Sequence, residues 1–448
     1  RSSEFCGSCH DVRLFGTDTL GAARAGEHFK RLRNAYSEWA AWAKTEQRAG
    51  RTAATCQDCH MSQYPGICER NEPGGEGDAA DPECPKGTHF AARAPGSFPK
   101  GRAADNAATV GSVVTHYFSG VDVPLSHEYP DALVDEPTVD LHGLPLSARK
   151  RRDLLLRHTF RFGLGSARLG GAGLSIPVEI ENTGAGHRVP AGFSQEREFW
   201  VHLAVRDGEG RVIYEVGRVT RNDEDLRDKV FERVDVRGDR RDGRGRPLGL
   251  FGADVRDGPD VPLWQPPTIL GGTAFRGRGL INFQNGFLRC VRCIGTIAAD
   301  GHCDALPDQQ ARRADRFVDG DYDLDTGECR SNLTGLEALF ETYFPVGALD
   351  ASRGILKGPD AIIDTRSMPP GVPLRYTYEL PVAGRRGPFR VEAELLFRAF
   401  PPFLVKAFIA YEREQARRGL RPSGPLVTDD MLKRLEIVEL ARASTEIR

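Results

Sequence analysis

Two short motifs near the amino terminus contain the residues best suited to chemistry. Each motif reads Cys-x-x-Cys-His, with Cys6, Cys9 and His10 in the first and Cys56, Cys59 and His60 in the second. This pattern is the attachment signature of a c-type haem. The two thiols add to the vinyl groups of the porphyrin, and the adjacent imidazole binds the iron as the proximal ligand. The motifs therefore predict two covalently bound c haems.

A redox-active or zinc-binding Cys-x-x-Cys pair that happens to precede a histidine is the competing interpretation. Two copies, neither within a thioredoxin-like strand–helix–strand pattern, favour haem attachment. Thioether bonds to haem form on the outer side of the cytoplasmic membrane. We therefore expect an exported protein, periplasmic or extracellular, in which disulfides are stable.

Each haem iron needs a second axial ligand, which in electron carriers is usually His or Met. Met61 directly follows His60 and cannot reach the opposite face of the same haem, so histidine is favoured. We expect His116 and His187 as distal ligands. For His187, the neighbouring glycines would let the backbone approach a flat ring. The histidines held in reserve are His158, His28 and His127. His202 is expected to alternate within a strand and to have no ligand role.

The elements that must position these ligands begin with a helix between the motifs. Apolar residues recur there at steps of three and four, which predicts one buried helical stripe, and Gly50 marks its end. The residues of the stripe are Phe29, Leu32, Tyr36, Trp39 and Ala43. The haems would supply the buried apolar area that a small helical domain lacks.

Five segments, 5–12, 34–39, 56–61, 116–120 and 186–192, occur in this order along the chain. Together they resemble a family of multihaem c-type cytochromes related to cytochrome c554. The resemblance covers residues 4–217 well and the region from 364 to 402 weakly. It implies electron transfer and makes His116 and His187 the preferred distal ligands. Family members often carry more than two haem motifs, whereas two are visible here.

From about residue 171 the pattern changes to strands. Segments 174–180, 374–380 and 389–397 have strand patterns, and 199–205 returns through a Gly-rich turn to 212–216 as a hairpin. Two closing helices are expected at 403–418 and 428–443. We therefore expect an α+β chain. Residues 1–170 would form a small, mostly helical or loop dihaem domain, and residues 171–448 a β-sandwich-like domain.

A long irregular insertion, at about 220–360, interrupts the strand pattern. It contains Cys290, Cys293, Cys303 and Cys329. Ile294 stands where a haem motif needs histidine, so these cysteines should hold no haem. They could form two disulfides or a four-thiolate zinc site, and an exported protein favours disulfides. Cys68 and Cys84 flank a loop rich in Gly, Glu and Asp and are also expected to pair.

Alternating carboxylates within the insertion suggest a weaker hypothesis. The residues are Asp319, Asp321, Asp323 and Asp325. Such a run can wrap Ca²⁺, but it lacks the glycine and the glutamate of the EF-hand template. A solvated acidic turn is therefore favoured over a calcium site.

The composition narrows the function further. Lys plus Arg number 61 against 63 Asp plus Glu, giving a net charge of −2, so nothing supports nucleic-acid binding. No apolar stretch is long enough to cross a bilayer. No signal peptide is visible, and because the first motif begins at Cys6 we expect that a leader was removed.

These observations favour an electron carrier over an enzyme. It would exchange electrons with a redox partner protein or with other cytochrome subunits, as a monomer or within a complex. A haem reductase is one alternative, but it needs an iron with an open coordination position, and the surplus of histidines favours full ligation. A structural subunit of a larger redox complex or cytochrome filament is the other alternative.

Overall fold

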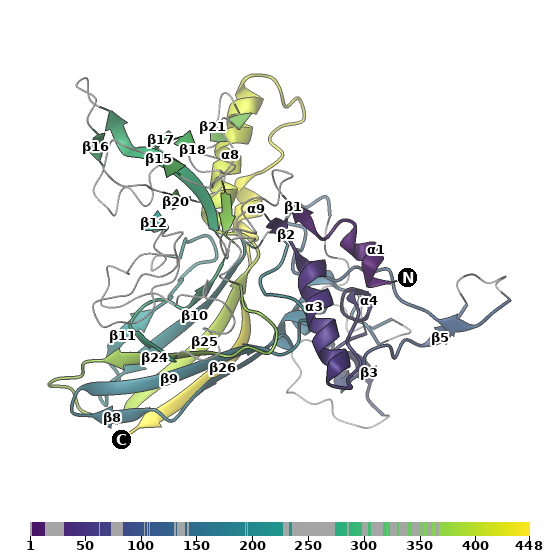
Figure 1. Ribbon diagram of the computed structural model, residues 1–448, viewed down its shortest axis with the longest axis horizontal. Coiled ribbons are helices and arrows are strands. Elements are labelled where there is room, and N and C mark those ends of the chain that lie inside the picture. Colours follow the sequence, from purple (N-terminus) through teal and green to yellow (C-terminus); the bar gives the residue numbers. More distant parts are fainter. Residues whose placement is uncertain are drawn as a thin grey trace. The chain divides into compact units, whose positions relative to one another are not determined.

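The computed structural model describes residues 2–13, 31–72, 84–131, 139–226, 274–297 and 367–448, apart from single or paired positions within these ranges, together with short strands at 233–234 and between 303 and 363. The chain forms two compact units. Unit 1 comprises Arg1–Asp11, Asn34–Arg161 and Asn182–Arg188, and unit 2 comprises Val12–Arg33, Phe162–Glu181 and Val189–Arg448. Helices and strands both contribute, in agreement with the predicted α+β class (Figure 1).

Unit 1 is built mainly from helices and loops. Its helices are α1 (Ser3–Gly7), α3 (Ala35–Arg48), α4 (Cys56–His60) and α5 (Ala148–Arg157). Two small antiparallel pairs accompany them, β3 (Gly66–Arg70) with β4 (Thr88–Ala92), and β5 (Lys100–Gly101) with β6 (Gly111–Ser112).

The helix predicted between the two motifs is present but begins later than expected. Asn34 is the N-cap of α3, and Leu32 lies instead in β2 (Arg31–Arg33), which pairs with β1 (Val12–Arg13). The Asn34 side chain makes no capping hydrogen bond; the pairing of β2 with β1 instead holds the preceding residues in a strand, which the apolar periodicity could not show. The predicted end is confirmed, because α3 stops at Arg48 and Gly50 has a φ of 72°.

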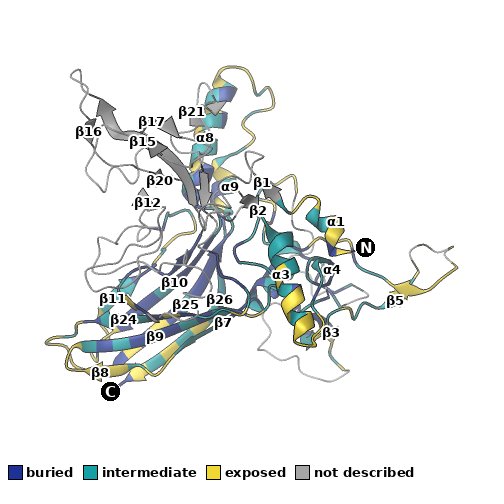
Figure 2. Ribbon diagram, viewed as in Figure 1, coloured by how far each residue is buried: buried dark blue, intermediate teal, exposed yellow. Residues whose placement is uncertain are grey.

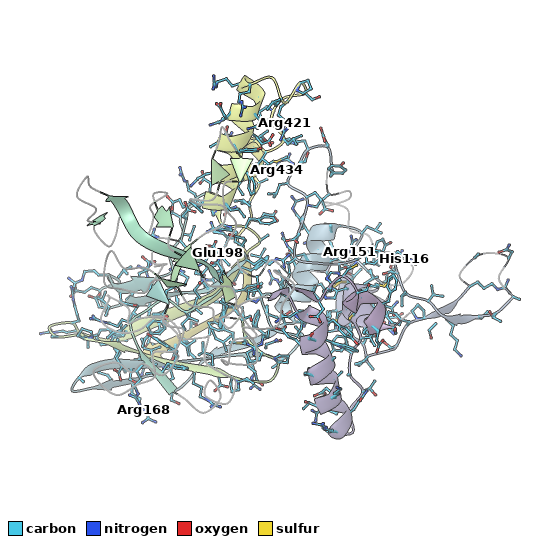
Figure 3. All side chains as sticks on the ribbon, turned by 45° about the horizontal axis from the view of Figure 1, so that its top comes forward. His116, Arg151, Arg168, Glu198, Arg421 and Arg434 are labelled. Atoms are coloured by element: carbon cyan, nitrogen blue, oxygen red, sulfur yellow. A yellow bond between two sulfur atoms is a disulfide. The ribbon has the colours of Figure 1, made fainter. Side chains whose placement is uncertain are left out.

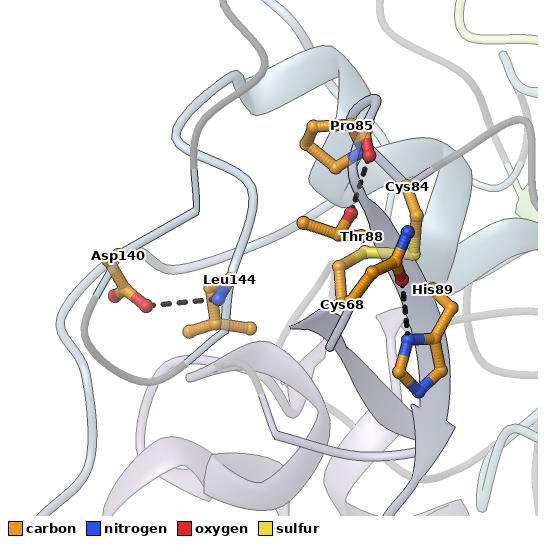
Figure 4. The surroundings of a disulfide bond; sticks show 8 residues. Cys68, Cys84, Pro85, Thr88, His89, Asp140 and Leu144 are labelled. Atoms are coloured by element: carbon orange, nitrogen blue, oxygen red, sulfur yellow. Dashed lines mark hydrogen bonds between the residues drawn. A yellow bond between two sulfur atoms is a disulfide. The ribbon is translucent and has the colours of Figure 1, made fainter. Parts of the chain in front are cut away.

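The predicted pairing of Cys68 with Cys84 is confirmed (Figure 4). The disulfide joins β3 to the chain just before β4, with Cα atoms 5.5 Å apart. Both cysteines are buried, and Val139 and Phe90 pack against them. The bond therefore closes this hairpin beside the rest of unit 1.

Unit 2 contains two five-stranded sheets. In the first, the order is β11 (Val212–Val216), β10 (Glu198–Arg206), β25 (Phe389–Arg398) and β26 (Val438–Ile447), with β14 (Asn282–Phe283) also paired to β10. In the second, the order is β13 (Ala274–Gly277), β24 (Leu374–Leu380), β9 (Gly173–Asn182) and β7 (Phe160–Leu164), with β8 (Arg168–Gly170) on β9. The five predicted strands and the β10–β11 hairpin are confirmed; a sandwich arrangement stays a prediction.

The strand sequences explain the core of unit 2. Buried and partly exposed residues alternate strictly along β9, as the period of two requires. Burial is nearly continuous along β10, whereas β25 alternates in its first half and is buried throughout its last four residues (Figure 2). Arg398 and Glu198 are fully buried there and pair at 2.6 Å, while the same guanidinium donates to the carbonyls of Asn222 and Glu224. The buried charges thus compensate each other.

The carboxyl-terminal region departs from its prediction in one element. The first closing helix is confirmed as α8 (Pro402–Arg417), and Glu412 on it binds Arg421. The second is wrong, because α9 spans only Asp429–Lys433 and the chain then continues as β26. The edge of β25 offers β26 a full ladder of backbone partners, and this pairing outweighs the helical preference of its Glu, Leu and Ala residues.

Within the insertion, β15 (Gly286–Ile297) pairs with β16 (Cys303–Ala305), β17 (Phe317–Asp319), β20 (Leu339–Thr342) and β23 (Ala361–Ile363). Further short strands are β12 (Arg233–Val234), β18 (Asp321–Tyr322), β19 (Cys329–Arg330), β21 (Leu349–Asp350) and β22 (Gly354–Ile355). The cysteines and aspartates singled out in this insertion have side chains outside the described residues. Among the described helices, none has the length and apolar character needed to cross a membrane.

Candidate functional site

The second Cys-x-x-Cys-His motif forms α4, which is fixed at its start. Thr55 and Asp58 make a reciprocal capping box, each side chain bonding the backbone N–H of the other. The buried Asp58 carboxylate also accepts a hydrogen bond from the Gly96 N–H at 2.6 Å. Capping satisfies N–H groups that a short helix cannot pair internally. Both motif cysteines and His60 therefore project from a fixed turn.

The His60 ring is oriented by one backbone carbonyl. Its Nδ1 lies 2.8 Å from the Ser119 oxygen, and the Ser119 N–H donates back to the His60 carbonyl at 2.7 Å. A carbonyl can only accept, so Nδ1 carries the proton and Nε2 carries the lone pair. Burial lowers the pKa of His60, the Ser119 bond opposes that effect, and nearby His10 adds to it. The ring is a neutral imidazole, the form that binds iron.

The ring of His187 lies near this imidazole. The two ring centroids are 6.2 Å apart and the ring planes differ by 12°. Imidazole nitrogens bind first-row metals at about 2 Å and each centroid lies roughly 1 Å behind its nitrogen, so two axial ligands of one metal have centroids about 6 Å apart. His187 Nδ1 lies 2.8 Å from the Arg188 carbonyl, which again leaves the lone pair on Nε2. The spacing and the donor atoms both fit a haem iron between the rings.

The loop that carries His187 is held from several sides. The buried Asn182 amide donates to the His187 carbonyl at 2.8 Å, and the Asn182 oxygen accepts from the Ala185 N–H at 3.0 Å. A Cβ at Gly186 would lie 2.4 Å from Trp42, and one at Gly184 would lie 2.0 Å from a backbone oxygen. Gly186 thus packs against the indole of Trp42, while the predicted approach of this backbone to a haem stays a prediction.

The first motif is fixed less tightly. Cys9 and His10 are exposed, whereas the ring of Tyr36 lies so close to Gly7 that a Cβ there would be 2.6 Å from it. The Tyr36 N–H donates to the His10 carbonyl at 3.3 Å, and the Ser37 hydroxyl donates to Asp11 at 2.6 Å. The amino-terminal turn of α3 thus holds the end of this motif.

The two motifs touch each other. The Gln57 amide donates to the Ser2 carbonyl at 3.1 Å and lies 3.8 Å from the Cys6 sulfur. The Cys56 N–H donates to the Ser3 hydroxyl at 3.2 Å. Burial raises the pKa of the Cys56 thiol, and the neighbouring Cys6 adds to the rise. Cys6 of the first motif and Cys56 of the second are therefore neighbours.

The Cys59 thiol does not match the redox interpretation of its motif. Burial raises the pKa of the Cys59 thiol to about 12. Disulfide-exchanging Cys-x-x-Cys pairs show the opposite shift, to a reactive thiolate. No cluster of three or more His, Cys, Asp or Glu side chains suited to a metal ion occurs among the described residues.

The remaining candidate histidines have other recorded ring contacts. His116 is exposed, its ring edge-on to Phe118 with centroids 6.3 Å apart; Figure 3 labels it near Arg151, whose guanidinium lies 4.5 Å from the Tyr117 ring centroid. His158 stacks on Phe90 at 4.2 Å. The other reserve ligands are His127, which is exposed, and His28, which lies outside the described residues.

His202, in unit 2, bonds two carboxylates. Its ring nitrogens lie 3.0 Å from Glu394 and 3.0 Å from Glu215. His202 lies on β10, and the two glutamates lie on the neighbouring strands β11 and β25.

Several residues that shape the site were not predicted. Ser119 acts through its carbonyl, and Glu38 accepts a hydrogen bond from the Arg188 N–H, 150 residues away along the chain. No sequence signal identifies either residue. Asp58 could have been found, since Thr and an acidic residue three positions later form a capping-box pattern.

Comparisons with known proteins add little to this geometry. No model of a protein family matches the chain, and no curated protein matches it. Among solved structures, it is similar to the crystal structure of a penta-haem cytochrome c552 from Thermochromatium tepidum, with 13% identity and a TM-score of 0.38. The match covers 100% of this chain and 56% of that chain, so this chain spans about half its length.

Proposed function

We propose that this chain is an electron-transfer protein with two covalently attached c haems, of which at least the second is held between two histidines. The observation that carries the proposal is the spacing of His60 and His187, with centroids 6.2 Å apart in nearly parallel planes. Face-to-face stacked rings would lie closer, near the 3.5–4.0 Å of carbon contacts. A metal held by the Nε2 atoms of both rings would account for the separation.

The haem iron would supply reversible one-electron exchange. The residues of the chain then fix its ligand set. Ser119 holds His60 with Nε2 as the metal-binding atom, and the Arg188 carbonyl does the same for His187. Cys56 and Cys59 lie on the same turn of helix as His60, where they would bond the porphyrin edge. Two neutral imidazoles favour a lower potential than a His/Met pair does.

The first haem would be attached through Cys6 and Cys9 with His10 as its proximal ligand. We assign His116 as its distal ligand, because it is the other of the two histidines expected in this role. Large aromatic surfaces beside the motifs support a bulky apolar group in this region. Phe5 is 78% exposed and Phe118 is 69% exposed, which is unfavourable for bare phenyl rings and would be relieved by a porphyrin.

Contact between the motifs supports electron passage from one haem to the other. Because Cys6 and Cys56 are neighbours, the porphyrin edges bonded to them would also be neighbours. Unit 2 would then serve docking or assembly, and the partner would be another redox protein or cytochrome subunit. Because haem is attached covalently outside the cytoplasm, the proposed activity would be periplasmic or extracellular.

Carbon monoxide binding to the reduced holoprotein tests the proposal. Full bis-His ligation predicts no spectral shift in the wild type, because CO needs an open axial position. His187→Ala should open one haem, so that about half of the Soret band shifts with CO. His202→Ala, in unit 2, is the matched control and should behave as the wild type. A shift in the wild type would contradict the carrier and favour a haem reductase.

A further inference from the structure

The side chain of Glu38 reaches the loop that carries His187. Its Oε2 accepts a hydrogen bond from the Arg188 N–H at 2.8 Å, and its Oε1 lies 3.6 Å from the Arg188 guanidinium. Both side chains are largely buried, at 13% and 15% exposure. A shielded carboxylate bound to both an amide and a guanidinium makes a stronger contact than a surface ion pair.

The backbone of Arg188 is thereby held at both its N–H and its carbonyl. Glu38 binds its N–H, and its carbonyl accepts from Nδ1 of His187. The ring of His187 is thus oriented by a residue whose own place is set by α3. Hydrogen bonds to the non-coordinating nitrogen of a histidine are known to fix the ring and tune the metal it binds.

The same turn of α3 also holds the other motif. Tyr36 and Ser37, which directly precede Glu38, bond His10 and Asp11. Trp39, which directly follows it, donates to the Ala54 carbonyl at 2.7 Å, just before the second motif. One helical turn therefore contacts the first motif, the chain just before the second motif, and the distal-ligand loop.

We infer that Glu38 is a positioning residue, which keeps His187 at binding distance from the second haem and sets that haem's potential. The inference rests on the proposed function. Glu38 touches no reacting atom and acts through Arg188. Its negative charge, balanced by the Arg188 guanidinium, also favours the oxidised, more positive iron. Loss of this charge alone would therefore raise the potential of one haem.

Two substitutions separate geometry from charge. Glu38→Ala removes the acceptor and should convert part of the second haem to a high-spin form that binds CO. Glu38→Gln keeps an oxygen for the Arg188 N–H but leaves the guanidinium unbalanced. It should stay low-spin while one of the two midpoint potentials rises. Removing both charges, in Glu38→Gln with Arg188→Gln, should return that potential toward the wild-type value.

The matched control is Glu46→Gln. Glu46 also lies on α3 and also pairs with an arginine, Arg51, at 2.6 Å. Both potentials and the spin state should stay as in the wild type. Haem content is counted first by intact mass, so that a wild-type chain without haem would reject the proposed function rather than this inference.

The inference is overturned if Glu38→Gln changes neither potential, or if it shifts both equally as a general structural change would. It is also overturned if Glu38→Ala destabilises the fold while both haems stay low-spin and closed to CO. If Glu38→Ala does not incorporate both haems, the potentials of Glu38→Gln and of Glu38→Gln with Arg188→Gln still test the inference.

Discussion

Replacing Gly186 by alanine would test the packing that positions the distal ligand. The new Cβ would lie 2.4 Å and 2.6 Å from two atoms of the Trp42 indole. Carbon atoms pack at about 3.5–4.0 Å, so the loop and the helix must separate by roughly 1 Å. Overpacking of this kind costs about 1–3 kcal/mol of unfolding free energy.

The displacement would act on the neighbouring residue, His187. Because an imidazole–metal bond of about 2 Å cannot stretch by half its length, the ligand must either detach or strain the loop. We expect a partly high-spin haem that binds CO after reduction, together with a lowered unfolding midpoint. Absorption spectra of the holoprotein with and without CO measure the first effect, and thermal denaturation measures the second.

Gly111→Ala provides the control, since a Cβ at that exposed glycine meets nothing within 4 Å. It should match the wild type in both assays. If Gly186→Ala stayed fully low-spin, ignored CO and unfolded at the wild-type midpoint, the account of how α3 packs against the ligand loop would be wrong.

Three further results are expected from the fold. Replacing both Cys68 and Cys84 by alanine should lower the unfolding free energy by about 3 kcal/mol, as for a loop of this size; an unchanged midpoint in denaturant would contradict it. Arg398→Met leaves the charge of Glu198 buried and uncompensated, so it should lower the unfolding free energy measured by chemical denaturation by about 3–5 kcal/mol. Hydrogen bonds from Arg421 hold the pKa of Glu412 below its usual range. The ionised Glu412 therefore stabilises the fold fully above the ordinary glutamate pKa of about 4.3, and this stabilisation is lost as the pH falls through the lowered pKa. Glu412→Gln should therefore be less stable than the wild type at neutral pH and converge with it in acid.

Local patterns predicted much of the fold. The alternation of residues in β9, β24 and β25 identified those strands, and the turn after β10 identified the hairpin. The error at β26 has a tertiary cause, because the helical preference of that segment was outweighed by pairing with β25. Such a pairing joins residues far apart along the chain and leaves no local signal.

In the candidate site, too, some residues could be predicted from the sequence and others could not. The proximal residues follow from the motif itself, since attachment chemistry fixes their spacing. The groups around them do not, because Ser119, Glu38 and Asn182 act through contacts with residues distant in sequence. A backbone carbonyl also carries no residue-type signature, so no pattern could have identified Ser119 as the acceptor for His60.

The mass of the denatured holoprotein tests the central claim most directly. Thioether bonds survive denaturation, so the chain should weigh its amino acids plus two haems and retain Soret absorption. Replacing the two cysteines of either motif by alanine should remove one haem and leave the other. A denatured polypeptide with no added mass and no Soret band would contradict the account.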